Sequence, residues 1–197
     1  DGTRNVCEVA KECGIKCFVH FSSCSIYGFS DKIMTEKDSG IPCDFYGMQK
    51  KVQEEIVLKY FPKALVLRLG TAFGFSPMMR FDLAMNSFVA KALNGERLTV
   101  FGGTQQRPFV SVRDVGRVVG FGIDKGLEGV YNLAGLNLTI LEMAKEICKL
   151  TGAEFEVNAE IQDRRNYVVS CKKLLREGFT FEYGIKDFVD EMRGKPE

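Results

Sequence analysis

The sequence of 197 residues lacks the features that mark membrane, zinc-binding and nucleic-acid-binding proteins. No apolar run approaches the roughly 20 residues that a membrane-spanning helix needs, and the first residues show no signal-peptide pattern. One histidine and no Cys-x-x-Cys pair leave no zinc-type spacing. The 27 Lys and Arg residues are almost balanced by 26 Asp and Glu residues. The protein therefore has no overall electrostatic field that would attract nucleic acid or an anionic membrane. We therefore expect no metal, nucleic-acid or membrane partner.

The cysteines also lack a pairing pattern. There are seven, an odd number, scattered along the chain. Such a set predicts reduced thiols and with them a cytoplasmic location. The hydrophobic content of 45% is ample for the core of one large domain or two small ones.

What the sequence does contain is the stretch 17–50, in which polar side chains follow an apolar run. That run stops at Ser22 and Ser23, which is typical of a buried parallel strand whose carboxyl end faces a crevice. In an open α/β sheet, ligands bind at that end. Tyr46 and Lys50 are four residues apart, so on a helix their side chains share one face. A hydroxyl, a phenol and an ammonium group are thus predicted to converge on one ligand.

Several segments together resemble a known family. Residues 21–28 read Phe-Ser-Ser-Cys-Ser-Ile-Tyr-Gly, and Tyr46-x-x-x-Lys50 follows. A Tyr-x-x-x-Lys pair alone is common by chance, but behind such a strand it is specific. The sequence is similar to the extended short-chain dehydrogenase/reductase family, in particular to NAD-dependent nucleotide-sugar epimerases and dehydratases such as UDP-galactose 4-epimerase. The resemblance continues through segments 68–74, 107–115 and 163–167 and so covers essentially the whole chain.

The resemblance implies a role for each residue of the predicted site. Tyr46 would be the acid/base, Lys50 would favour its phenolate and bond the nicotinamide ribose, and Ser23 would bond the reacting sugar hydroxyl. The residues implied for the cofactor are Ser22, Tyr46, Lys50, Leu69, Gly70, Thr71 and Ala72. The residues implied for the sugar nucleotide are Ser23, Cys24, Ser25, Asn86, Arg107 and Arg164.

For some of these assignments, the alignment with the family's motif does not decide between neighbouring residues. Arg107 and one of Arg164 and Arg165 are expected to bind the diphosphate, because guanidinium forks bind phosphate oxygens in pairs. Cys24 and Ser25 stand where the family's 4,6-dehydratases have the acid and the base of a Thr-Asp-Glu motif. The carboxyl groups that dehydratases use to eliminate water are therefore missing at these two positions. Cys24 is predicted to be a small buried residue.

The alternation of strands and helices up to about residue 74 predicts an α/β fold. We expect the C-terminal part of a doubly wound, Rossmann-type parallel sheet at 1–74 and 109–133, with a smaller α/β substrate-binding lobe at 75–108 and 134–197. Such a sheet begins with a Gly-x-Gly-x-x-Gly-like turn that binds pyrophosphate, and this sequence has none. We therefore expect a C-terminal fragment that is inactive alone. The cofactor is expected to be NAD, with NADP left open.

The apolar spacing of residues 45–60 predicts a helix with one face toward the sheet. The residues expected inside are Phe45, Met48, Val52 and Ile56, and those expected outside are Lys51, Glu54 and Glu55. Val57, Leu58 and Tyr60 are left over, which favours a partner surface on this helix. The resemblance implies a homodimer through helices 3–13 and 45–60, and the alternative is a monomer in which N-terminal elements cover these residues.

Two polar residues in predicted strands need partners. His20 is expected to be a hydrogen-bonded core histidine, and Arg68 is expected to form a structural ion pair.

Three functions are considered. The leading one is an NAD-dependent epimerase that acts on a nucleotide-diphosphate sugar through a transient 4-keto intermediate. The alternative is a nucleotide-sugar reductase or 4-ketosugar-processing dehydrogenase of the same family. A non-catalytic dinucleotide-binding protein would typically lack the Tyr or the Lys, and both are present.

Overall fold

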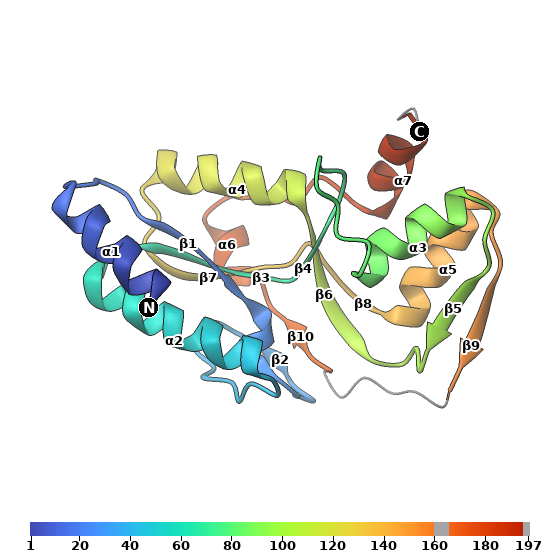
Figure 1. Ribbon diagram of the computed structural model, residues 1–197, viewed down its shortest axis with the longest axis horizontal. Helices are drawn as coiled ribbons and strands as arrows, with labels where there is room; N and C mark the ends of the chain where they lie inside the picture. Colours follow the sequence, from blue (N-terminus) through green and yellow to red (C-terminus); the bar gives the residue numbers. More distant parts are fainter. Residues whose placement is uncertain (160–165, 195–197) are drawn as a thin grey trace.

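The structure is a computed structural model that describes residues 1–159 and 166–194 (Figure 1). Its elements in chain order are α1 (Gly2–Glu12), β1 (Val19–Ser23), η1 (Cys24–Tyr27), β2 (Ile33–Met34), α2 (Phe45–Tyr60), β3 (Leu65–Leu69), β4 (Thr71–Phe73), α3 (Ala84–Leu93), β5 (Leu98–Phe101), β6 (Gln106–Ser111), α4 (Val112–Lys125), β7 (Gly129–Leu133), β8 (Leu136–Thr139), α5 (Ile140–Thr151), β9 (Phe155–Asn158), β10 (Val168–Val169), α6 (Lys172–Arg176) and α7 (Ile185–Arg193). In this part of the chain, no helix is both long and apolar enough to cross a membrane.

A parallel sheet of order β1-β3-β7 forms the centre of the fold, as the sequence predicts. Its register aligns Ser22 with Arg68 and Arg68 with Asn132. The sheet is covered on both faces (Figure 1), with α4 on one side and α1 and α2 on the other. Leu65 packs in a cluster with α4, whereas Val66 packs in a cluster with α1 and α2, because side chains alternate along a strand.

A second sheet of order β4-β6-β8 lies beside the first. Strand β4 is parallel to β6, and β6 is antiparallel to β8. Helices α3, α5 and α7 enclose a core with this sheet and with β5, and α5 begins with a capping box of Thr139 and Glu142. The sequence did not reveal β4, which has only three residues. It did not reveal β6 either, because residues 102–107 indicate a polar loop. The division into two units at the predicted boundaries remains a prediction.

Helix α2 has the predicted bounds, but the prediction of its buried face is wrong. Phe45, Met48 and Val52 are exposed by 72%, 51% and 52%, whereas Glu54 is exposed by only 5% and Val57 is fully buried. Helix α2 is thus turned so that a carboxylate faces the sheet. Phe45, Met48 and Val52 remain on the surface.

Helix α1 likewise keeps apolar side chains outside. Val6 and Val9 are exposed, and Cys7 is the residue of this helix that is buried. Cys7 packs in a cluster with Val57 of α2 and Val66 of β3. The two helices therefore meet the sheet through a narrow seam.

Candidate active site

A cleft of about 550 Å³ opens where β1 and β3 end and α2 begins. Its lining residues are Phe21, Ser22, Ser23, Ser25, Asp44, Tyr46, Lys50, Leu69, Gly70, Thr71, Ala72, Arg80, Leu83 and Tyr167. The structure thus brings together the three predicted catalytic residues and all of the predicted cofactor residues. Phe21, Asp44, Arg80 and Leu83 were not predicted. Tyr167 belongs to a segment that carried the resemblance, and this was its only signal.

Ser23 stands at the point where the strand becomes a helical turn. It ends β1 and caps η1, where its hydroxyl accepts a hydrogen bond from the backbone N–H of Ser25 at 3.1 Å. This bond satisfies a donor that the turn would otherwise leave open. The cap also fixes the hydroxyl at the edge of the cleft.

The start of α2 is pressed against this turn. Asp44 caps the helix by accepting a bond from the N–H of Gly47 at 2.7 Å. A Cβ at Gly47 would lie 2.7 Å from the carbonyl oxygen of Ser25, so only glycine permits the approach. This contact brings Tyr46, which is half-exposed, to the same cleft as the serines.

Lys50 connects the phenol to the end of β1. Its Nζ donates to the carbonyl oxygen of Phe21 at 3.0 Å and lies 5.8 Å from the centre of the Tyr46 ring. Burial lowers the pKa of Lys50. An ammonium held in this way can stabilise a phenolate and still present protons to a ligand.

His20 lies on the same strand, and the prediction that it is a hydrogen-bonded core residue is wrong. It is half-buried, and its Nε2 has no hydrogen-bond partner within the described residues. Burial lowers its pKa most, the charge of Lys50 lowers it further, and Glu54 raises it. The imidazole is therefore favoured in its neutral form.

A buried ion pair lies directly behind the cleft. Arg68 of β3 donates to Glu54 of α2 with Nη2 at 2.8 Å and Nε at 2.9 Å, as the prediction of a structural ion pair for Arg68 requires. Ser22 donates its hydroxyl proton to the same carboxylate. On the far side, Arg68 Nη1 donates to the phenol oxygen of Tyr27 at 2.9 Å, and that phenol donates to Asn132 at 2.7 Å. This network joins α2, β1, β3 and β7. It also corrects the expectation that Glu54 is exposed.

The backbone after β3 forms the floor of the cleft. Gly70 donates its N–H to the carbonyl oxygen of Leu133 at 2.9 Å. A Cβ at Gly70 would lie 2.8 Å from the carbonyl oxygen of Pro108, so a side chain has no room there. Gly70 therefore presents only backbone to the cleft, which Leu69, Thr71 and Ala72 also line.

Three other predicted substrate residues, Cys24, Asn86 and Arg107, are not among the residues that line the cleft. Cys24 is fully buried, its Sγ donates to the carbonyl oxygen of Arg68 at 3.1 Å, and burial raises its pKa, as expected for a small buried residue. The buried Asn86 binds the N–H of Gly74 at 3.3 Å and the carbonyl oxygen of Arg80 at 3.2 Å. The guanidinium of Arg107 lies 5.9 Å from the centre of the Tyr167 ring. Arg164 lies outside the described residues.

Comparison with curated proteins finds relatives that match the whole chain. The Trifunctional UDP-glucose 4,6-dehydratase/UDP-4-keto-6-deoxy-D-glucose 3,5-epimerase/UDP-4-keto-L-rhamnose-reductase RHM1 of Arabidopsis thaliana is 27% identical over 216 residues, which are 100% of this chain and 32% of the relative. The Low-salt glycan biosynthesis protein Agl12 of Haloferax volcanii is 27% identical over 212 residues, 100% of this chain and 68% of the relative. The chain thus spans about a third of the first relative and two thirds of the second.

Solved structures agree in fold. MoeE5 in complex with UDP-glucose and NAD superposes with a TM-score of 0.84 and 27% identity, covering 97% of this chain and 69% of that one. MoeE5 in complex with UDP-glucuronic acid and NAD gives 0.81 and 26%, with 95% and 67% covered. Residues 1–134 match the NAD dependent epimerase/dehydratase family. Since this match takes in most of the chain and, apart from Tyr167, all of the residues that line the cleft, the chain belongs to the NAD dependent epimerase/dehydratase family.

Proposed function

We propose that the intact protein is an NAD-dependent epimerase of a nucleotide-diphosphate sugar that works through a transient 4-keto intermediate. The observation that carries this proposal is the convergence of Ser23, Tyr46 and Lys50 on one cleft at the end of β1. A hydroxyl, a phenol and an ammonium group are the groups needed to bind a sugar hydroxyl and move its proton.

The residues present fit the nicotinamide end of NAD. Lys50 would bond the ribose, Ser22 would lie beside it, and the backbone of residues 69–72 would line the ring, because the floor at Gly70 leaves no room for a side chain. When bound, NAD would supply the hydride acceptor and donor. The adenosine end needs residues beyond those that line this cleft.

Side chains of the protein would transfer the proton of the sugar hydroxyl. Tyr46 would take the proton of the sugar C4 hydroxyl, and Lys50 would stabilise the phenolate that makes this possible. Ser23 would hold the same hydroxyl and share its proton. For the return step Tyr46 gives the proton back, so the protein ends unchanged.

Dehydration is disfavoured because the groups that it needs are not in place. Cys24, at the position of the dehydratase acid, is fully buried and bonded to a backbone carbonyl. Ser25, at the position of the base, has a hydroxyl that remains neutral at the pH of the cell. With no carboxyl at either position, epimerisation is favoured over elimination of water.

The diphosphate would be bound by arginines, for which Arg107 is the first candidate. It is buried beside Tyr167, which lines the cleft. Arg164, Asn86, Ser25 and the backbone around Cys24 would complete the sugar-nucleotide site. The RHM1 relative is named for reactions of UDP-sugars, and MoeE5 is in complex with UDP-glucose, which supports a UDP-sugar as substrate.

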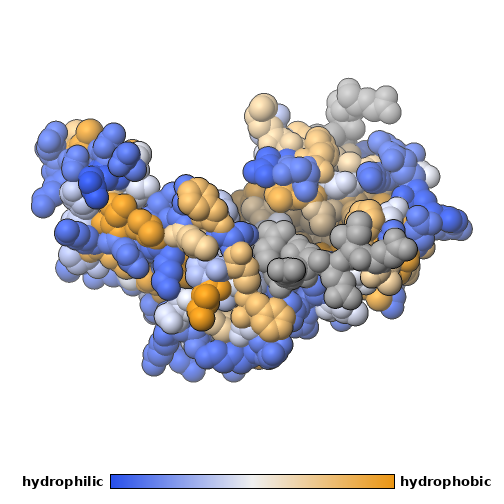
Figure 2. Space-filling view, turned by 60° about the horizontal axis from the view of Figure 1, so that its bottom comes forward, coloured by the Kyte–Doolittle hydropathy of each residue, from blue (hydrophilic) through white to orange (hydrophobic). Residues whose placement is uncertain are grey.

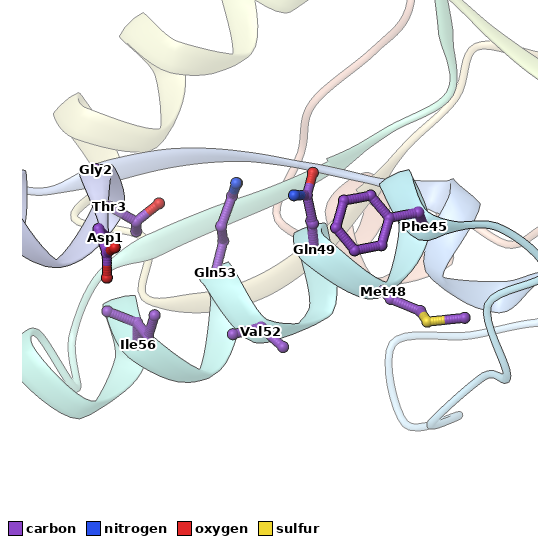
Figure 3. A pocket seen from close by; sticks show the side chains of 9 residues that line it. All are labelled: Asp1, Gly2, Thr3, Phe45, Met48, Gln49, Val52, Gln53 and Ile56. Atoms are coloured by element: carbon purple, nitrogen blue, oxygen red, sulfur yellow. The ribbon is translucent and has the colours of Figure 1, made fainter.

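The protein is further proposed to be a homodimer through α1 and α2, but with a different face from the one expected. Val57 is fully buried, so it cannot contact a partner. Figure 3 shows a groove between the start of α1 and the side chains of Phe45, Met48, Val52 and Ile56 on α2. Figure 2 shows hydrophobic surface among polar residues on this side of the molecule.

Sedimentation of the intact protein tests this interface. Val52→Glu with Met48→Glu should give a monomer, while Glu55→Gln on the exposed polar side should leave the dimer intact. A dimer that survives the double substitution would exclude this face. We also propose a cytoplasmic location, which is supported by the free thiols of all seven cysteines.

The activity is tested by incubating the intact protein and NAD with UDP-, dTDP- and GDP-sugars and analysing the product at C4. An epimerase interconverts two sugars without net change in NADH, whereas a reductase consumes one NADH for each product. Net consumption of NADH would replace the epimerase by the reductase.

A further inference from the structure

Ser22 is held at the cleft by a carboxylate that lies behind it. It lines the cleft next to Ser23, although it is only 3% exposed. Its hydroxyl is bonded to Oε1 of Glu54, whose side chain is 6% exposed. The proposed proton transfer uses neither Ser22 nor Glu54. Their bond is thus a buried polar contact at the edge of the site with no part in that transfer.

The direction of this hydrogen bond follows from Arg68. Its Nη2 and Nε donate to the two oxygens of Glu54 at 2.8 and 2.9 Å, so Glu54 is the carboxylate that balances a guanidinium. A carboxylate can only accept, so Ser22 must donate its single hydroxyl proton to Glu54. No group in the described part of the chain donates to the oxygen of Ser22. That oxygen therefore has only lone pairs left to offer to a ligand.

The carboxylate is kept in this orientation from the far side of the sheet. Nη1 of Arg68 donates to the phenol oxygen of Tyr27 at 2.9 Å, and the phenol donates to Oδ1 of the fully buried Asn132 at 2.7 Å. Arg68 is thus fixed on both sides. Glu54 would lose two bonds to the guanidinium if it turned away from Ser22.

Lys50 is the group that complements Ser22. Its Nζ donates to the carbonyl oxygen of Phe21, the residue before Ser22, so the two side chains reach the cleft at the same end of β1. An ammonium can only donate hydrogen bonds. A ligand group that lies between them must therefore accept from Lys50 and donate to Ser22. A ribose hydroxyl does both with one oxygen atom, whereas a carbonyl or phosphate oxygen can only accept.

We propose that Glu54 is a positioning residue for the cofactor: it accepts the hydroxyl proton of Ser22, so that Ser22 in turn accepts a hydrogen bond from a nicotinamide-ribose hydroxyl that Lys50 holds. The proposal rests on the proposed function, because that function places the ribose at Lys50. Glu54 touches neither cofactor nor sugar and acts only through Ser22. The alternative is that Ser22 serves only to satisfy the buried carboxylate, in which case binding of the ribose would not depend on it.

Binding measurements on the intact protein test the proposal without relying on turnover. Calorimetry would compare NAD with two analogues in which fluorine, which has no proton to donate, replaces the 2′- or the 3′-hydroxyl of the nicotinamide ribose. We expect NAD to bind the parent protein more tightly than at least one analogue. Ser22→Ala should reduce this ratio of affinities roughly 3- to 10-fold, which corresponds to one hydrogen bond. Ser39→Ala, which removes an exposed hydroxyl outside the cleft, is the matched control and should leave the ratio unchanged.

Glu54→Gln tests the positioning role itself. Because Arg68 needs an acceptor, the amide would turn its oxygen to Arg68 and its NH2 group to Ser22. Ser22 would then accept from the amide and point its own proton into the cleft, so the ratio of affinities should fall as it does in Ser22→Ala. A loss of stability alone would weaken NAD and its analogues equally and leave the ratio unchanged. If Glu54→Gln does not fold, Ser22→Ala decides alone.

The outcomes separate this proposal from the proposed function. An unchanged ratio in Ser22→Ala would overturn the proposal, and an unchanged ratio in folded Glu54→Gln would remove Glu54 from positioning. A ratio that depends on Ser22 and Glu54, in a protein that epimerises no sugar, would keep the positioning role and remove the epimerase. Epimerisation together with an unchanged ratio would keep the epimerase and leave Ser22 a structural residue.

Discussion

Substitution of Glu54 by Gln should destabilise the fold strongly, although the change is nearly isosteric. The Glu54 and Arg68 side chains are only 6% and 10% exposed and share a bidentate contact. Gln keeps one acceptor oxygen but leaves the guanidinium without its counter-charge. Loss of one partner of a buried pair costs about 3–5 kcal/mol. We take the lower half of this range, because Arg68 keeps its bond to Tyr27.

The assay is denaturant unfolding of the chain, followed by circular dichroism. Glu55→Gln is the matched control, since Glu55 is the next residue of α2 and its side chain is exposed. We expect the control to stay within about 0.5 kcal/mol of the parent. The double variant Glu54→Met with Arg68→Met should recover much of the loss, because it removes both buried charges. A Glu54→Gln variant as stable as the control would refute the argument that this pair holds α2 to the sheet.

Three further predictions concern single side chains in the intact protein or the chain. Tyr46→Phe should lower turnover by several orders of magnitude and leave NAD affinity almost unchanged, because the phenol moves the proton while Lys50 holds the ribose. Near-normal turnover in rapid-quench assays would remove Tyr46 from catalysis. Arg107→Ala should raise the KM for the sugar nucleotide far more than it lowers kcat, since a contact distant from C4 contributes uniform binding; an unchanged KM would argue against Arg107. Thr139→Ala should cost about 1 kcal/mol of unfolding free energy through loss of the cap of α5, and an unchanged denaturation midpoint would contradict this.

The spacing of apolar residues was enough to predict the bounds of helix α2. The polar residues at the end of β1 and the start of α2 come together because parallel strands deliver their carboxyl ends to one edge. The sequence therefore sufficed to locate the cleft.

The rest depended on contacts between segments far apart in the chain. Strand β4 has only three residues and strand β6 contains Pro108, so no alternation revealed them. Arg80 lies in an irregular segment, and its position depends on an amide of α3. His20 was expected to find a hydrogen-bond partner because its neighbours are apolar, but its buried Nε2 has none within the described residues.

The orientation of α2 shows most clearly why hydrophobic periodicity misled. Periodicity assumes that a helix buries its most apolar stripe. Here the inward stripe contains Tyr46, Lys50 and Glu54, each four residues from the next, because the first two must reach the cleft and the third reaches Arg68. The ion pair with Arg68 offsets the cost of burying Glu54 at a position where an apolar side chain would otherwise pack. The apolar residues that remain outside, Phe45, Met48 and Val52, would then be available to a second copy of the chain. The orientation that lets α2 serve the cleft is thus the same one that leaves a surface for the proposed dimer.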